Sequence, residues 1–199
     1  MSIIRITDPV SFAVSLAEVK EFVKLPGSTA EDDLFVSFLK SAESYAENYM
    51  KRSIMPQQWR LRIDSVSDNI QLLRGPLSTV STAVSNFSYY DSTNGTNAMP
   101  STCYTVDTNY EYPRIYRTYD ADWPDDIRPS AESVNIEYWT GYKNKDSVPE
   151  PIKAWIKLRV ASQWQNREAI MIGSGNFLTQ LPHNYVDGLL DEFVILQVA

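Results

Sequence analysis

A short segment of the sequence holds four aspartates, Asp120, Asp122, Asp125 and Asp126. Paired carboxylates can bind a divalent cation or serve as the acid and base of a hydrolase. The segment lacks the glycine turn and the distal glutamate of an EF-hand loop, and paired-carboxylate hydrolysis depends on a separation that a sequence does not give. We therefore interpret the segment as a solvated loop, and a metal-dependent enzyme using these aspartates remains an alternative.

Three other features of the sequence could take part in chemistry. Cys103, the only cysteine, falls in an expected strand, where a buried and inert thiol is typical. His183, the only histidine, has no serine or cysteine motif nearby, so we expect a structural or exposed histidine. The run Gly173-Ser174-Gly175 resembles part of a phosphate-binding loop, but no strand precedes it and no lysine follows. We expect no catalytic residue, no metal site and no cofactor.

The charge of the chain is acidic, with 18 lysines and arginines against 25 aspartates and glutamates, a net −7. Proteins that grip DNA through its phosphates need a basic surface, and no basic run here exceeds two residues. The sequence also lacks a secretion signal and a run of about 18 apolar residues that could span a membrane. A single cysteine suits a reducing compartment. These features predict an acidic, cytosolic, globular protein that does not act at a membrane.

The first 56 residues predict two helices. Ser15 with Glu18, and Ser28 with Glu31, form the capping-box pattern that starts a helix. The second helix is expected to run to about Arg52, with a wide apolar stripe along one side. The stripe consists of Leu34, Phe35, Phe38, Leu39, Ala42, Tyr45, Ala46 and Tyr49.

Residues 57–146 change to a period of two, which is typical of half-buried strands. The clearest alternation lies at Trp59, Leu61 and Ile63 and again at Val134, Ile136 and Tyr138. Asn94-Gly95 is a turn signal, and several prolines place their neighbours in loops or at strand edges. We expect a small antiparallel sheet or barrel with long loops.

Residues 147–199 return to a helical pattern that begins at Pro149-Glu150-Pro151. Each predicted helix has one apolar face that needs a partner, so we expect the N- and C-terminal helices to pack together. The expected helical core comprises Leu34, Phe38, Tyr45, Trp155, Ile156 and Trp164. The sequence therefore predicts an α+β fold, with a helical domain formed by residues 1–56 and 147–199 and a β-rich insertion at residues 57–146.

A series of short motifs along nearly the whole chain resembles the head–tail connector (adaptor or head-completion) proteins of tailed bacteriophages. In chain order the motifs are Pro9-Val10, Leu16-Ala17-Glu18-Val19-Lys20, Asp32-Asp33-Leu34, Gln58-Trp59, Arg74-Gly75-Pro76-Leu77, Val134-x-Ile136-x-Tyr138-x-x-Gly141-Tyr142, Val148-Pro149-x-x-Ile152-Lys153, Trp164-x-Asn166-Arg167-Glu168 and Leu181-Pro182. Each motif is short, and their order carries the resemblance.

The resemblance implies a non-enzymatic structural protein of the virion neck, assembled in the cytoplasm of the host bacterium. Its copies would form a ring, commonly of twelve, beneath the portal protein. The ring would extend the DNA channel and offer a docking platform to the next neck or tail-completion protein. Genome DNA would pass through without sequence-specific binding, which agrees with the acidic charge of the chain.

The end of the chain departs from that pattern. Many members of the resembled family close with a Pro-Tyr-Arg-like segment, whereas residues 193–199 of this chain are apolar and uncharged. An exposed apolar segment of this kind is an aggregation hazard and needs a surface to cover it. We expect Phe193, Val194, Ile195 and Leu196 to dock on the portal or an adjacent subunit, rather than to fold back on their own domain.

A second interpretation follows from the aromatic content: twelve tyrosines, five tryptophans and seven phenylalanines, many of them in residues 57–146. Tyrosine and tryptophan combine apolar area with a polar atom and are enriched at contact surfaces. The chain could therefore be a carbohydrate- or receptor-binding component of a tail or baseplate. In that case the β-rich part would be the functional unit, and the protein would not form a ring.

Overall fold

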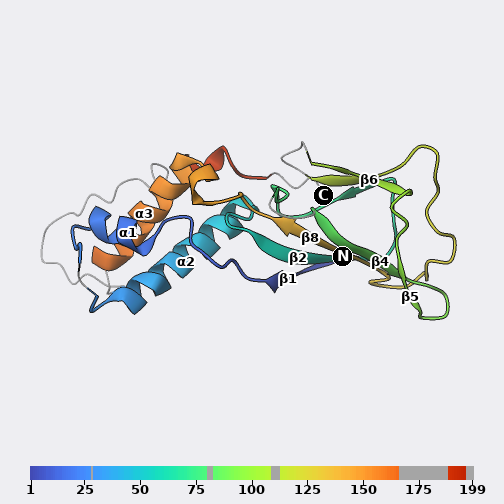
Figure 1. The fold of residues 1–199 in the computed structure, drawn as a ribbon, viewed down its shortest axis with the longest axis horizontal. Coiled ribbons are helices and arrows are strands. Elements are labelled where there is room, and N and C mark those ends of the chain that lie inside the picture. Colours follow the sequence, from blue (N-terminus) through green and yellow to red (C-terminus); the bar gives the residue numbers. More distant parts are fainter. Residues whose placement is uncertain (28, 80–82, 109–112, 166–187, 196–199) are drawn as a thin grey trace, which may run out of the picture. The chain divides into compact units, whose positions relative to one another are not determined.

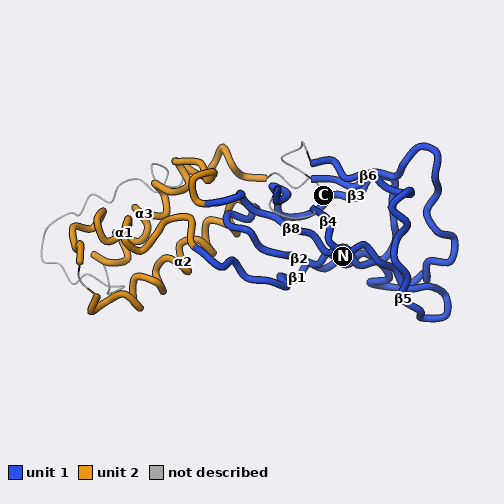
Figure 2. The backbone as a smooth tube through the Cα atoms, in the orientation of Figure 1, with its two compact units in different colours: residues 1–11, 51–144 blue, residues 12–50, 145–199 orange. Residues whose placement is uncertain are grey.

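The computed structural model describes residues 1–27, 29–79, 83–108, 113–165 and 188–195 of the chain. The chain divides into two compact units, one formed by Met1–Ser11 and Lys51–Asn144 and the other by Phe12–Met50 and Lys145–Ala199 (Figures 1 and 2). Unit 1 consists of antiparallel strands and unit 2 of helices. The α+β class predicted from the sequence is confirmed.

The boundary between the units differs from the predicted domain division. Residues 1–11 and 51–56 belong to unit 1, although the sequence pattern assigned them to the helical domain. The reason is a strand, β1 (Ser2–Thr7), which pairs antiparallel with β2 (Gln57–Ile63) and places Ile4 opposite Arg60. Since β1 is held by residues more than fifty positions away, its assignment depends on a partner that local periodicity does not reveal.

The larger sheet has five antiparallel strands in the order β1-β2-β8-β4-β5. Its other members are β8 (Val134–Thr140), β4 (Val84–Tyr90) and β5 (Thr96–Ala98). Along β2 and β8 every second residue is buried, so one face of the sheet is apolar. On the opposite face Arg60 and Glu137 form an ion pair with an N–O distance of 2.6 Å.

A second sheet consists of β3 (Asn69–Gln71), β7 (Arg114–Arg117) and β6 (Tyr104–Asp107), in the order β3-β7-β6. Its residues Ile70 and Ile115 share one hydrophobic core with Leu61 and Ile136 of the larger sheet. Among the described residues the two sheets remain separate. The sequence predicts either a sheet or a small barrel. The described residues form two sheets around one core.

Unit 2 contains α1 (Leu16–Phe22), α2 (Asp32–Met50) and α3 (Glu150–Gln165), with a 3₁₀ turn η1 (Lys145–Ser147) before α3. The predicted capping box at α1 is present: the Ser15 amide donates to Glu18 Oε2 at 2.7 Å, and the Glu18 amide donates to Ser15 Oγ at 3.3 Å. Ser28, the expected cap of the second helix, lies outside the described residues.

The core of unit 2 lies between α2 and α3, which run beside each other in Figure 1. The buried residues of the two helices recur at helical spacing, as an amphipathic helix requires. The apolar ones are Phe35, Leu39, Ala42, Ala46 and Met50 of α2 and Ile152, Trp155, Ile156 and Val160 of α3. Within the part of the chain that the structure describes, no helix has both the length and the apolar character needed to cross a membrane.

Candidate interaction surface

The aspartate segment lies in the loop between β7 and β8, and its four carboxylates do not converge. Asp122 pairs with Arg117 at 2.9 Å, and Asp126 accepts a hydrogen bond from the Tyr89 hydroxyl at 3.1 Å. Asp120 and Asp125 are exposed. No group of histidine, cysteine and acidic side chains among the described residues could hold a metal ion. The arrangement is that of a solvated loop with local pairing.

The other residues considered for chemistry are either buried or outside the described parts. Cys103 lies one residue before β6, not within a strand, and is buried with 7% of its surface exposed. Its position suits the expected inert thiol. His183 and the Gly173-Ser174-Gly175 run lie outside the described residues.

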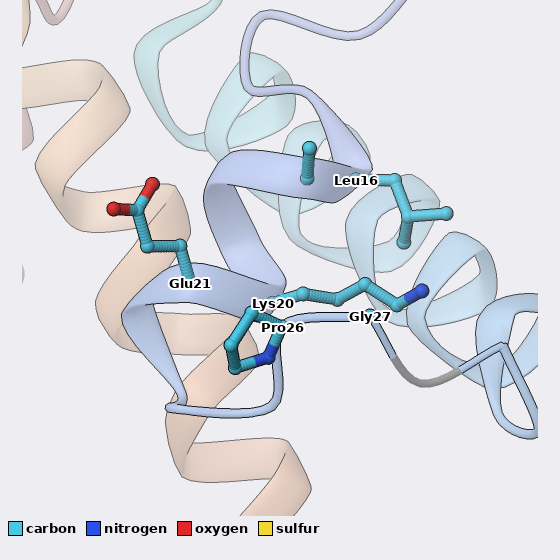
Figure 3. A pocket seen from close by; sticks show the side chains of 6 residues that line it. Leu16, Lys20, Glu21, Pro26 and Gly27 are labelled. Carbon is cyan, nitrogen blue, oxygen red and sulfur yellow. The ribbon is translucent and has the colours of Figure 1, made fainter.

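A surface depression of about 620 Å³ lies beside α1 and the loop that follows it (Figure 3). It is lined by Leu16, Ala17, Lys20, Glu21, Pro26 and Gly27. In Figure 3 the side chains of Lys20 and Glu21 extend in opposite directions, and the Lys20 ammonium pairs with Asp32 at the start of α2. Lys20 and Glu21 are the only ionisable residues of the six, and they extend in opposite directions, so the depression does not resemble an active site.

The expected helical core is only partly the observed one. Trp155 and Ile156 are buried, and the Trp155 ring stacks on Tyr45 with a centroid distance of 5.5 Å. Trp164 is half-buried and stacks on Phe35 at 4.6 Å. The prediction is wrong for Tyr45, because 46% of its surface is exposed.

Leu34 and Phe38 are also half-buried and not central. They lie with Tyr45 on one flank of a wide stripe, while Phe35 and Leu39 occupy its middle. Tyr45 carries the guanidinium of Arg159 on its ring, with 5.5 Å from the carbon to the ring centroid. The flank is therefore an aromatic border of the core.

A buried carboxyl group lies inside unit 2, at Glu43 of α2. The Ala13 amide donates to Glu43 Oε1 at 2.6 Å, which ties the segment before α1 to α2. The Glu43 pKa is raised to about 8, mainly because the carboxyl is buried; the Ala13 amide lowers it and the nearby Glu47 carboxylate raises it. Glu43 is therefore mainly protonated at neutral pH in the folded protein.

The C-terminal segment contradicts part of the docking prediction. Ile195 is buried, with 5% of its surface exposed, and its amide donates to the carbonyl oxygen of Met50 at 2.9 Å. This residue folds back on its own unit, because both its side chain and its backbone find partners there. Phe193 and Val194 are half-buried, and Leu196 lies outside the described residues.

Few aromatic side chains in unit 1 are free to form a sugar-binding surface. Tyr104 and Trp123 both pack on Phe87, with ring centroids at 4.9 and 6.0 Å. Tyr119 is 95% exposed, but it is the only aromatic residue among the large exposed apolar side chains of the described part of unit 1. The aromatic content of this unit serves mainly its core.

The solved structures similar to this chain include three chains from gene transfer agent particles. A chain in the neck of an empty particle, computed with C6 symmetry, has a TM-score of 0.77 at 18% identity, over 100% of this chain and 98% of that one. A chain in the virion of a native particle has a TM-score of 0.76 at 18% identity, with the same coverage. A chain in the neck of a native particle, computed with C12 symmetry, has a TM-score of 0.66 at 17% identity, over 98% of this chain and 97% of that one. The chain shares their fold.

No family model matches the sequence, and no curated protein matches it. The likeness is therefore one of structure along the full length of the chain, at an identity that does not by itself transfer a function. It agrees with the order of motifs seen in the sequence, which also extends over nearly the whole chain.

Two features of the structure had no counterpart in the sequence interpretation. The first is the edge strand β1, with Ile4 at 49% and Ile6 at 42% exposure. The second is the buried Glu43. The sequence contains a sign of its burial, because Glu43 lies four residues after the buried Leu39 and continues that side of the helix. A charged residue within an apolar stripe is a reason to expect a buried polar contact.

Proposed function

We propose that the chain is a head–tail connector subunit, a structural and non-enzymatic part of the neck of a tailed phage or phage-like particle. Its copies form a ring, of twelve in the resembled family, beneath the portal protein. The ring extends the DNA channel and provides a platform for the next neck or tail-completion protein. The protein is assembled into the virion in the cytoplasm of the host bacterium.

The observation that carries this proposal is the likeness in fold over 100% of this chain to a chain in a gene transfer agent neck, which the chain covers to 98% of its length. A match confined to one unit would show only a shared module. This match includes both the β unit and the helical unit, each of which is built from two separate stretches of the chain. Fold alone does not imply function, and the ordered motifs in the sequence supply independent support.

Charge and chemistry are consistent with the same role. A net charge of −7 disfavours tight binding to phosphates, so DNA can pass without sequence-specific contacts. The acidic loop and the surface depression lack the converging groups that an enzyme would need. The solvated loop of residues 120–126 has no assigned role in this proposal.

The C-terminal segment keeps a narrower part in the proposal. Since Ile195 is bound within its own unit, contact with the portal or an adjacent subunit would involve Phe193, Val194 and Leu196. Deleting residues 196–199 removes Leu196 and leaves Ile195 in place, so the helical unit should stay folded while attachment to the portal is weakened. Wild-type occupancy of the truncated chain in purified necks would contradict this role.

The decisive experiment is to count and place this chain in purified particles. Native mass spectrometry of assembled necks and electron cryomicroscopy of the same particles should give a ring of copies next to the portal. One or two copies, or a position at the distal end of a tail or on a baseplate, would contradict the proposal. The second of these outcomes would favour a receptor-binding role.

A further inference from the structure

The outer edge of β1 is a candidate for pairing with another chain. β1 forms one border of the five-stranded sheet, next to β2 (Figure 1). Its six residues extend for about 20 Å at about 3.4 Å per residue. Within the described ranges no strand pairs with its outer side. Such an edge presents backbone N–H and C=O groups that can bond to a further strand.

The side chains of β1 leave this edge unprotected. Ile4 lies opposite Arg60, so it shares the polar face of the sheet and not the core face of Trp59 and Leu61. Edge strands are usually protected by short length, proline or charge. The one charged residue of β1, Arg5, lies with its guanidinium carbon 5.7 Å from the centroid of the Trp59 ring, on the core face. Arg5 lies between Ile4 and Ile6 in the strand, but its guanidinium pairs with Asp8 at 2.8 Å and lies over the Trp59 ring, away from the face of Ile4. The register with β2 shifts between Arg5 and Thr7, so the pairing places Ile4, but not Ile6, on this face.

The opposite border of the same sheet has a complementary character. β5 has three residues, and Thr96 and Ala98 are both exposed. The pairings of Ala98 with Ser88 and of Ser88 with Asn135 place Ala98 on the same face as Ile4. One edge thus carries branched apolar side chains and the other carries small ones, which leaves room for them.

The direction of the strands decides between two ways of joining copies. In a sheet of five antiparallel strands the two border strands, β1 and β5, run in the same direction. A rotation of about 30° between neighbours in a twelve-copy ring keeps strand directions nearly aligned, so β5 of one copy would meet β1 of the next as a parallel pair. Two β1 strands related by a two-fold axis would instead form an antiparallel pair and close a dimer.

The geometry points to a head-to-tail contact in which the β1 edge of one copy pairs with the β5 edge of the next copy of the same chain. The proposal rests on the ring described under Proposed function, because rings require contacts between two different surfaces of each subunit. It places the exposed Ile4 against the neighbour's Thr96 and Ala98.

The small size of this contact determines how the ring should assemble. With three residues in β5, the parallel pair is short, and parallel pairing is slightly less stable per residue than antiparallel pairing. A stable pairwise complex usually buries about 800 Å² on each partner, far more than a few paired residues provide. In a closed ring each copy makes two such contacts, and this multivalency compensates for the small area of each contact. A free dimer should therefore not accumulate.

The first test introduces charge at the edge, with I4K/I6K in the full chain and Y119K as a matched control at an exposed site far along the sequence. Both variants should keep the wild-type circular dichroism spectrum. In cells that produce particles, I4K/I6K should enter purified necks at least about tenfold less than wild type, and Y119K should enter normally. Normal incorporation of I4K/I6K into necks that contain the ring would overturn the β1 contact and leave the proposed function standing.

The second test uses disulfide trapping in purified necks, with Cys103 replaced by alanine. The I4C/A98C chain should give a ladder of linked copies after oxidation, while I4C alone should give none. Linked dimers from I4C alone would show β1 pairing with itself, and no ladder from the double variant would also refute the contact. Necks that contain no ring of this chain would refute the proposed function itself.

Discussion

The buried carboxyl group of Glu43 predicts a pH dependence of stability that can be isolated by one substitution. Its pKa is about 8 in the folded protein, against an ordinary value of 4.5 for an accessible glutamate. Between these two values the folded state holds a proton that the unfolded state has released. Raising the pH through this window therefore weakens the folded state. Below the window both states are protonated, so the stability no longer changes with pH on account of Glu43.

The magnitude follows from the width of the window. At about 1.4 kcal/mol for each pH unit, full ionisation of Glu43 lowers the free energy of unfolding by up to about 4–5 kcal/mol. The stabilising contribution is complete below about pH 4.5, declines as the pH rises, and is lost above about pH 8. Most of the cost is desolvation of a carboxylate that is 7% exposed, which one amide hydrogen bond from Ala13 offsets only in part.

The assay compares wild type with Glu43→Gln by urea denaturation across pH, followed by far-UV circular dichroism. Glutamine keeps an acceptor for the Ala13 amide and cannot ionise, so the difference between the two proteins cancels all other titrations. Glu43→Gln should gain several kcal/mol over wild type between about pH 5 and pH 9. The exposed Glu21→Gln is the control and should follow wild type. Parallel stability curves for Glu43→Gln and wild type would refute the reasoning.

Two further predictions concern packing. Trp155→Ala should lower the free energy of unfolding by about 3–5 kcal/mol because the ring is 1% exposed, while Tyr45→Ala, at the exposed border of the same stack, should cost less than half as much in the same denaturation assay. Gly141→Ala should strongly reduce thermal stability, since φ is +108° and a Cβ would lie 2.3 Å from the Met55 carbonyl oxygen. Gly27→Ala is its control, because φ is +81° but nothing lies within 4 Å, so only the backbone strain of about 1–3 kcal/mol should appear. Equal losses of stability in Trp155→Ala and Tyr45→Ala, or in Gly141→Ala and Gly27→Ala, would contradict these packing assignments.

The sequence predicts those elements in which buried residues recur at a regular spacing, because each of them lies along one continuous core. β2 and β8 alternate strictly because Leu61 and Ile136 lie opposite each other on the same buried face. α2 could be predicted from its apolar stripe, but the width of that stripe hid which side was central, so Tyr45 was placed in the core.

The remaining elements lack such a local signal. β3 and β5 have three residues each, too few to establish a period of two. In β1 the adjacent residues Ile3 and Ile4 point to opposite faces, so the run fits neither an amphipathic strand nor a helix. The return of Ile195 to Met50 depends on a contact between residues far apart in the chain, and the apolar character of the tail alone did not show where it would bind.

The division of the chain into interleaved units has a consequence for its biosynthesis. Each unit draws on two separate stretches of sequence, because Met1–Ser11 needs Lys51–Asn144 and Phe12–Met50 needs the residues from Lys145 onward. The N-terminus leaves the ribosome first, so α1 and α2 emerge long before α3. In the same way β1 emerges before its partner β2, and β8 follows later still. Unit 1 cannot close its core until β8 has been made, and unit 2 cannot close its core until the residues from Lys145 onward follow. A nascent chain stalled before Val134 would therefore expose two incomplete cores at once.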